Sequence, residues 1–270
     1  MIRSPVVAGK FYSADKKELR EQLASFVPRT AKKKTLACVM PHAGYIYSGL
    51  VATETAASIA IPENIILIGP NHTGRGNPFS IISKGKWQTP LGTVEIQSAV
   101  AESLKANCPL IKEDERAHAN EHSLEVQLPI LQFLREKEFR FVPLVVMPAP
   151  RHAYGDVAEA IAGSITALSI AETTLIVASS DMTHYESHES AQKKDTFAIE
   201  AILNLDENLL LERVAQHNIS MCGYVPTVIV IIAAKKLGAK KAELIKYQTS
   251  GDVSGDYDSV VGYAGIVISK

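Results

Sequence analysis

Histidines follow three short apolar segments of the sequence, each shortly after the segment ends. His42 follows TLACVM, His72 follows NIILIGP, and His184 follows TTLIVASS together with Asp181. If these segments are strands of one sheet, their carboxyl ends meet at an edge where open α/β sheets bind ligands. Neutral imidazole is the commonest metal ligand in proteins. The recurrence therefore favours one shared pocket that holds a metal ion over three unrelated, solvated loop histidines.

Cys222 offers a further ligand of a different kind. It lies in SMCGYVP, directly before an apolar segment that we expect to be helical from Pro226. The amides and dipole of a helix N-terminus favour a thiolate, which is the form that binds metal or attacks an electrophile. The alternative is that Cys222 is a small buried apolar residue. Cys38, inside a predicted strand, and Cys108, beside a proline, are assigned no role.

A second histidine-rich segment, ERAHANEHSLEVQLPILQFL, contains His118, Glu121, His122 and Glu125. Its HANEH portion matches the H-x-x-E-H pattern of one class of zinc protease. That pattern needs both histidines within one helix, whereas Asn120 indicates that the helix begins between them. We expect His122 and Glu125 to face the pocket as proton-handling groups or partners of the ligands, and His118 to be peripheral. The alternative is an exposed start of an amphipathic helix.

The elements that position these residues alternate between strand and helix patterns, which is typical of α/β proteins with a parallel or mixed sheet. The predicted strands are Thr35–Met40, Asn64–Gly69, Phe141–Met147, Thr173–Ala178 and Val260–Ile268. The predicted helices are Asp15–Phe26, Gly49–Ile59, Ser98–Lys105, Glu121–Glu136, Asp156–Leu168, His188–Asn204, Glu207–Gln216 and Pro226–Leu237. Between them, Gly74–Val94 is expected to be an irregular excursion or a small hairpin. We find no long linker and expect one domain over residues 1–270.

Composition narrows the class of protein. The 270 residues are 46% hydrophobic, which is enough for a sizeable core. Lys plus Arg total 28 and Asp plus Glu total 29, so no broad field attracts nucleic acid or an anionic membrane. Three cysteines and the lack of an apolar leader predict a reducing, cytoplasmic location without disulfides. The partner we expect is a small molecule or a peptide.

The ordered blocks of this sequence resemble the MEMO family (mediator of ErbB-driven cell motility), called AmmeMemoRadiSam system protein B in bacteria and archaea. The resemblance covers nearly the whole chain. It rests on RSPVVAGKFYSAD, PHAGYIYSG, LIGPNH, NEHSLEVQLPIL, SSDMTHY, MCGYVP and SGDVSGDYDSVVGYA. Members of this family are similar in fold to the LigB-type class III extradiol dioxygenases. The resemblance therefore implies a three-layer α/β/α fold around a central mixed, largely parallel sheet.

The resemblance also implies a metal centre. Carried over to this sequence, the ligands are His42, His72 and Cys222, and Asp181 and His184 line the same pocket. The dioxygenases hold Fe(II) with two histidines and a glutamate, so a thiolate here takes the place of the carboxylate and ring cleavage is not implied. We expect one metal ion, Fe(II) first, with Cu or Zn as alternatives.

Three functions are compatible with this centre. In a redox enzyme, Fe(II) or Cu would activate O2 or a small substrate, and His184, oriented by Asp181, would move protons. A non-catalytic member would capture a peptide in the same cleft, as the link of animal members to receptor signalling implies. A zinc-dependent hydrolase would need a general base such as Glu125. The family resemblance further implies AMMECR-type and radical SAM proteins as possible partners.

Overall fold

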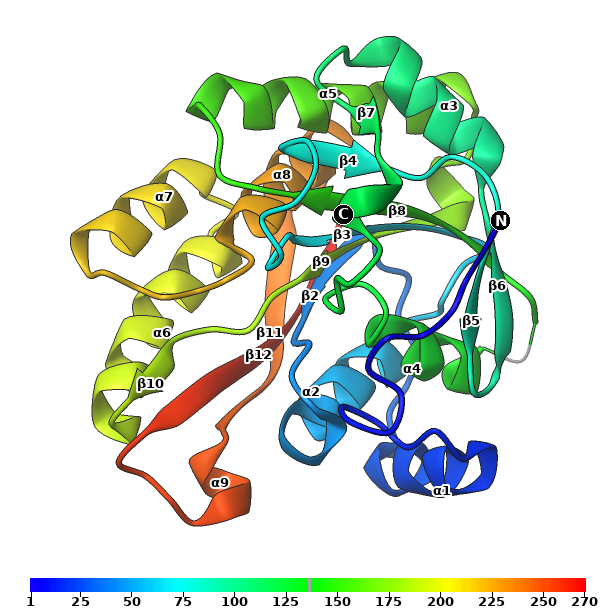
Figure 1. Cartoon of the computed structure of the whole chain (residues 1–270). Coiled ribbons are helices and arrows are strands. Elements are labelled where there is room, and N and C mark those ends of the chain that lie inside the picture. The colour runs from blue at the N-terminus through cyan, green and yellow to red at the C-terminus, as the bar shows by residue number, and fades with distance from the viewer. Residues whose placement is uncertain (136) are drawn as a thin grey trace.

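Five apolar strands form the middle of the central sheet in the computed structural model, which describes residues 1–135 and 137–270 (Figure 1). They are β2 (Ala37–Met40), β3 (Asn64–Pro70), β8 (Arg140–Val146), β9 (Thr174–Ser179) and β12 (Val260–Ser269). Their order across the sheet is β8–β3–β9–β2–β12. The first four are parallel to one another, and β12 is antiparallel to β2. The carboxyl ends of β3, β9 and β2 therefore lie side by side at one edge.

Shorter strands extend the sheet on both sides. β1 (Ile2–Arg3), β5 (Lys86–Thr89) and β6 (Gly92–Ile96) continue it beyond β8, and β4 (Phe79–Ile81) pairs with β8 and with β7 (Lys112–Glu113). On the other side, β10 (His184–Glu186) and β11 (Lys241–Thr249) both pair with β12. The expected excursion between residues 74 and 94 thus contains β4, β5 and the start of β6, and β5 and β6 form an antiparallel hairpin.

Helices cover both faces of the sheet (Figure 1). On one face lie α1 (Lys16–Phe26), α2 (Tyr45–Ala57) and α4 (Gln127–Leu134). On the other lie α3 (Ser98–Asn107), α5 (Arg151–Ala167), α6 (His188–Leu203), α7 (Glu207–Gln216) and α8 (Tyr224–Lys236). A one-turn helix, α9 (Gly251–Ser254), precedes β12, and 3-10 turns span Glu115–Ala117 and Ala171–Thr173. This arrangement confirms the expected three-layer α/β/α fold with a mixed, largely parallel sheet.

The middle strands are predominantly apolar because each one serves two cores. In β3, Ile66 and Ile68 pack into the core under α5 and α8, whereas Ile65 and Leu67 pack into the core under α2 and α4. Successive side chains of a strand point to opposite faces, so a strand covered on both sides is apolar on both faces over most of its length. Burial of each such side chain contributes about 1.5–3 kcal/mol, so the middle of the sheet is the rigid part of the structure.

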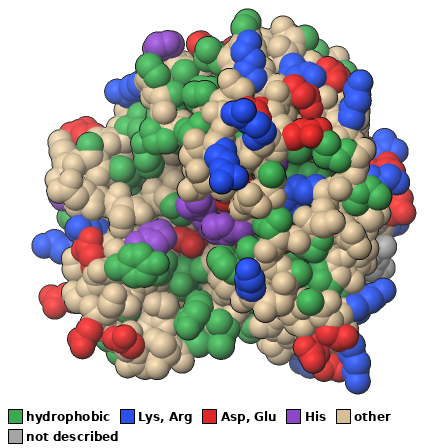
Figure 2. Space-filling view, viewed as in Figure 1, with side chains coloured by type: hydrophobic (Ala, Val, Ile, Leu, Met, Phe, Trp, Pro, Cys, Tyr) green, Lys and Arg blue, Asp and Glu red, His purple; other side chains and the backbone are tan. Residues whose placement is uncertain are grey.

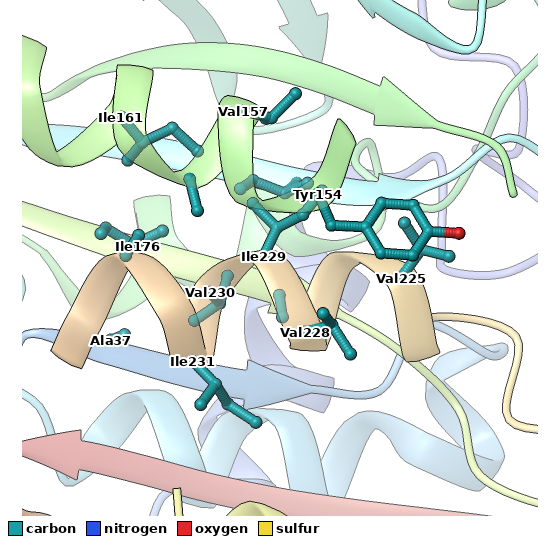
Figure 3. Packing of buried hydrophobic residues seen from close by; sticks show 14 of the residues in the cluster. Ala37, Tyr154, Val157, Ile161, Ile176, Val225, Val228, Ile229, Val230 and Ile231 are labelled. Atoms are coloured by element: carbon teal, nitrogen blue, oxygen red, sulfur yellow. The ribbon is translucent and has the colours of Figure 1, made fainter. Parts of the chain in front are cut away.

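Helix α8 is apolar all round because it is enclosed on several sides. Figure 3 shows α8, with Val228, Ile229 and Val230, against the strands and beside α5. These three residues are at most 1% exposed. A helix without a polar face is typical of a buried position. Its packing fixes the turn that precedes it, which carries Cys222. Among the described residues, no helix has both the length and the apolarity needed to cross a membrane.

The fourth predicted helix begins six residues later than expected. The prediction was Glu121–Glu136, whereas α4 starts at Gln127; Glu136 lies outside the described residues. The physical reason is that the Glu121 carboxylate accepts hydrogen bonds from the backbone amides of His122 and Ser123, each 2.9 Å long. A short side chain-to-backbone bond of this kind competes with helical hydrogen bonding. The segment between Glu121 and α4 forms turns instead.

The N-terminal segment is attached to the turn before α4 by a buried ion pair. Arg3 Nη1 lies 2.7 Å from Glu125 Oε2, and the two side chains are 7% and 1% exposed. Glu125 also accepts hydrogen bonds from the amides of Val6 and Val7 and from the hydroxyl of Tyr12. Removing one member of a buried ion pair leaves the other charge uncompensated, which costs far more than loss of an exposed pair.

We predict that Glu125→Gln lowers the free energy of unfolding by about 3–5 kcal/mol, because Arg3 then stays buried without its counter-charge. Tyr12→Phe, which removes one hydrogen bond to the same carboxylate, should cost about 1.5–3 kcal/mol. Urea unfolding followed by circular dichroism measures both. Glu115→Gln, at an exposed position, is the control and should change stability by less than about 0.5 kcal/mol. An unchanged midpoint for Glu125→Gln would contradict this assignment.

Candidate metal centre

Three loops at the carboxyl edge of the sheet bring His42, His72 and Cys222 together. His42 follows β2, His72 follows β3, and Cys222 precedes α8. One ligand atom of each residue lies within 4.8 Å of the others, and Cys222 Sγ is 3.3 Å from Nε2 of His42. Figure 2 shows histidine side chains gathered around a hollow near the middle of this view, with acidic side chains beside them. The sequence-predicted ligands thus form one group.

The ring of His42 is held so that one nitrogen is free for a metal. Its Nδ1 lies 2.9 Å from the hydroxyl oxygen of Ser179. The Ser179 hydroxyl donates its own proton to the carbonyl of Ser123 at 2.6 Å, so it must accept from His42. Nδ1 therefore carries the proton, and the lone pair is on Nε2, which faces Cys222.

His72 is held in the same way by a carboxylate. Its Nδ1 lies 2.9 Å from Oε1 of Glu121, which can only accept a hydrogen bond when ionised. Nε2 of His72 is therefore the nitrogen with the free lone pair. The His72 backbone amide donates to Oε2 of the same carboxylate, so both the ring and the loop depend on Glu121. This pairing of a ligand histidine with a buried carboxylate is common in metal sites.

The electrostatics of the pair favour the ionised form of Glu121. Burial raises its pKa, but the hydrogen bond and charge of His72 and the amide of Ser123 outweigh that effect and lower the pKa to about 2. Burial lowers the pKa of His72, yet the hydrogen bond and charge of Glu121 raise it on balance. The sequence placed Glu121 in a histidine-rich segment but assigned it no role. Its position directly before His122 is the feature of the sequence that could have indicated a role at the site.

Asp181 and His184 lie beside this group, in a different relation from the one expected. His184 Nδ1 donates to the carbonyl of Ser220 at 3.0 Å, so this backbone oxygen, not Asp181, sets its tautomer. Asp181 instead accepts the backbone amide of His42 through Oδ1 at 2.7 Å. Ligand atoms of Asp181, His184 and Cys222 lie within 4.8 Å of one another. Both residues therefore line the pocket, and within residues 1–135 and 137–270 no hydrogen bond to Nε2 of His184 is found.

His122 and Glu125, the two residues of the second histidine-rich segment that we expected to handle protons, lie in different places. The ring of His122 stacks on that of His72, with centroids 4.7 Å apart, and lies 5.7 Å from the ring of His42. Glu125 is not in this group, because its carboxylate is taken up by Arg3, two backbone amides and Tyr12. His118 is fully buried and donates from Nε2 to the carbonyl of Ser80, which is a structural contact.

The pKa shifts in the pocket differ between the candidate ligands. Burial, together with the charges of His72 and His122, lowers the pKa of His42 well below its usual value, so its imidazole is neutral and able to bind metal. Burial raises the pKa of the Cys222 thiol, and the nearby Asp181 carboxylate adds to the effect. In the metal-free protein these effects oppose the thiolate that the sequence favoured at the start of α8. A bound cation would reverse this, because coordination deprotonates a thiol.

Comparison with known proteins agrees with the sequence resemblance. The family model for Memo-like proteins matches residues 3–267. A MEMO1 family protein of Methanopyrus kandleri is 46% identical over 100% of both chains, and one of Aquifex aeolicus is 45% identical over 98% of both. The crystal structure of an uncharacterized Escherichia coli K12 protein covers 87% of this chain and 100% of its own, with a TM-score of 0.57 at 15% identity, which shows a similar fold alone. The chain, with its histidine- and cysteine-lined pocket, belongs to the MEMO1 family.

Proposed function

We propose that this protein binds one redox-active transition-metal ion through His42, His72 and Cys222 and uses it in the oxidation or reduction of a small molecule. One observation carries the proposal. Both ligand imidazoles already donate Nδ1–H to fixed acceptors, Ser179 and Glu121, so that Nε2 is the nitrogen left for a metal. Preorganised donors of this kind lose little freedom when the ion binds, which favours affinity.

The donor set fits some metals and not others. Two neutral imidazoles and a thiolate form a borderline-soft set that suits Fe(II), Cu or Zn, whereas Mg²⁺ and Ca²⁺ prefer oxygen ligands. Three protein ligands leave coordination positions for a substrate or an oxidant. When bound, Fe(II) or Cu would supply one-electron transfer. We favour Fe(II).

The other residues of the pocket serve this centre in distinct ways. Ser179 and Glu121 orient the two ligand rings, and Asp181 holds the backbone of the His42 loop. His122 and His184 are the imidazoles outside the ligand set, so they are available to take or give a proton. Burial lowers the pKa of His122, so its neutral, proton-accepting form dominates at neutral pH.

The first prediction concerns metal binding under anaerobic conditions with one equivalent of Fe(II). His42→Gln and His72→Gln should lose stoichiometric metal, because each removes a ligand nitrogen. Glu121→Gln should weaken binding by about 10–100-fold, because it removes the acceptor that orients His72. Equilibrium dialysis with elemental analysis measures the bound metal. His152→Gln, an exposed histidine on α5, serves as the control. Wild-type affinity in His72→Gln would rule out this ligand set.

The second prediction tests redox chemistry by changing only the metal. Fe(II)-loaded protein should consume oxygen in the presence of small reductants such as catechols or thiols, because Fe(II) transfers electrons. Zn²⁺-loaded protein has the same donors but no redox activity, so it should consume none. An oxygen electrode provides the measurement, and Fe(II) with Cys222→Ser gives the background rate. The proposal fails if the Fe(II)-loaded wild type does not exceed that background.

A further inference from the structure

Gln127 is a polar side chain at a buried position of a largely apolar helix. It is the first residue of α4, whose sequence is QLPILQFL, and it is 0% exposed. Among the described residues, its amide oxygen Oε1 has no hydrogen-bond partner. A buried polar atom without a partner destabilises the folded state, and few are found in native proteins. An apolar side chain of similar size, such as methionine, would avoid that cost, so the contribution of Gln127 comes from its amide nitrogen.

The amide nitrogen of Gln127 connects the ends of two strands beside the metal centre. Nε2 donates to the carbonyl of Pro41 and to the hydroxyl oxygen of Ser179, each at 2.8 Å. Ser179 is the last residue of β9, and Pro41 directly follows β2. The paired residues of these strands end at Met40 and Ser179, and Pro41 has no amide that could continue the ladder. A side-chain donor therefore takes over where the backbone pairing stops.

The orientation of the amide follows from these contacts. A carbonyl oxygen can only accept a hydrogen bond, so the NH2 group of Gln127, and not Oε1, faces Pro41. The reversed amide would bring two acceptor oxygens together. Nε2 is therefore also the atom that donates to Ser179. The start of α4 is itself fixed, because the Tyr45 hydroxyl donates to the Val126 carbonyl at 2.6 Å.

The Ser179 hydroxyl, with one proton and two lone pairs, uses its whole hydrogen-bonding capacity here. It donates its proton to the carbonyl of Ser123. Its lone pairs accept from Nδ1 of His42 and from Nε2 of Gln127. The hydroxyl oxygen is thus held from two sides, by Gln127 and Ser123, at the position that His42 requires. Gln127 also holds the carbonyl of Pro41, so it fixes the residue before His42 as well.

We infer that Gln127 is a positioning residue for His42. It acts through the Ser179 hydroxyl, which accepts Nδ1–H, and through the carbonyl of Pro41. The effect is that Nδ1 keeps its proton and Nε2 faces Cys222. Without this anchor the Ser179 side chain can rotate, and a neutral imidazole that loses its acceptor populates both tautomers. The consequence for metal binding rests on the proposed function, whereas the position of the proton does not.

NMR of the metal-free protein with nitrogen-15 in its histidines tests the inference, because the nitrogen shifts show which ring nitrogen carries the proton. In wild type, His42 and His72 should both be protonated at Nδ1, and these protons should be protected from exchange with solvent. Gln127→Met should lose this protection at His42 and show the Nε2–H form, whereas His72, held by Glu121, should stay unchanged. Gln132→Met, at a half-buried position of the same helix, is the matched control.

Two further variants and a binding measurement complete the design. Ser179→Ala removes the acceptor directly and should release the His42 ring as Gln127→Met does. Gln127→Leu is a second apolar replacement of different shape, and circular dichroism selects the variant that keeps the wild-type fold for the comparison. In equilibrium dialysis with Fe(II), the selected variant should bind the metal about 10–100-fold more weakly than wild type, because the ligand ring is no longer oriented.

The outcomes separate this inference from the proposed function. A His42 ring that keeps its protected Nδ1–H in the folded Gln127 variant would overturn the inference. Equal loss of protection at His42 and His72 would also overturn it, because the pocket would then have loosened as a whole. A protected Nδ1–H in Ser179→Ala would overturn the action through that hydroxyl. Release of the His42 ring alone supports the inference even if wild type binds no Fe(II), a result that would overturn only the proposed function.

Discussion

The buried carboxylate of Glu121 is the constraint on which the pocket depends. It binds the ring and backbone amide of His72 and the amides of His122 and Ser123, so it connects the loop after β3 with the turn before α4. The turn before α4 also positions the Ser123 carbonyl, which accepts a hydrogen bond from the Ser179 hydroxyl. The same hydroxyl oxygen accepts a hydrogen bond from Nδ1 of His42. One anion thus influences the orientation of both histidines proposed as ligands. Its low pKa means that this influence persists at every physiological pH.

The sheet supplies the rigidity that such an arrangement needs. β2, β9 and β3 are adjacent and parallel, and both of their faces are buried, so the loops that carry His42, Asp181 and His72 leave from fixed points. Cys222 lies in the turn that directly precedes the enclosed helix α8. Metal sites built at the ends of regular elements hold their donors more precisely than sites on long loops. The cost is a partly buried thiol and a buried carboxylate, which a bound cation would stabilise.

Much of this could be predicted from the sequence because the informative signals are local. The apolar strands β2, β3, β8, β9 and β12 were recognisable from their composition, and the histidines after β2 and β3 indicated a shared edge. β11 was missed because its residues, KAELIKYQT, are polar and only partly buried, so they lack a clear alternating pattern. The bonds of Glu125 could not be predicted, since Arg3 lies 122 residues away in the chain. Glu121 and Ser220, which set two ring tautomers, depend on contacts of the same long-range kind.

The central claim is that a nitrogen of His42, a nitrogen of His72 and the sulfur of Cys222 bind one ion. X-ray absorption at the zinc K-edge, on protein loaded with one equivalent of Zn²⁺, tests it most directly. We predict one sulfur at about 2.3 Å and imidazole nitrogens at about 2.0–2.1 Å, with the sulfur absent in Cys222→Ser. A wild-type shell of nitrogen and oxygen alone, unchanged by Cys222→Ser, would contradict the account.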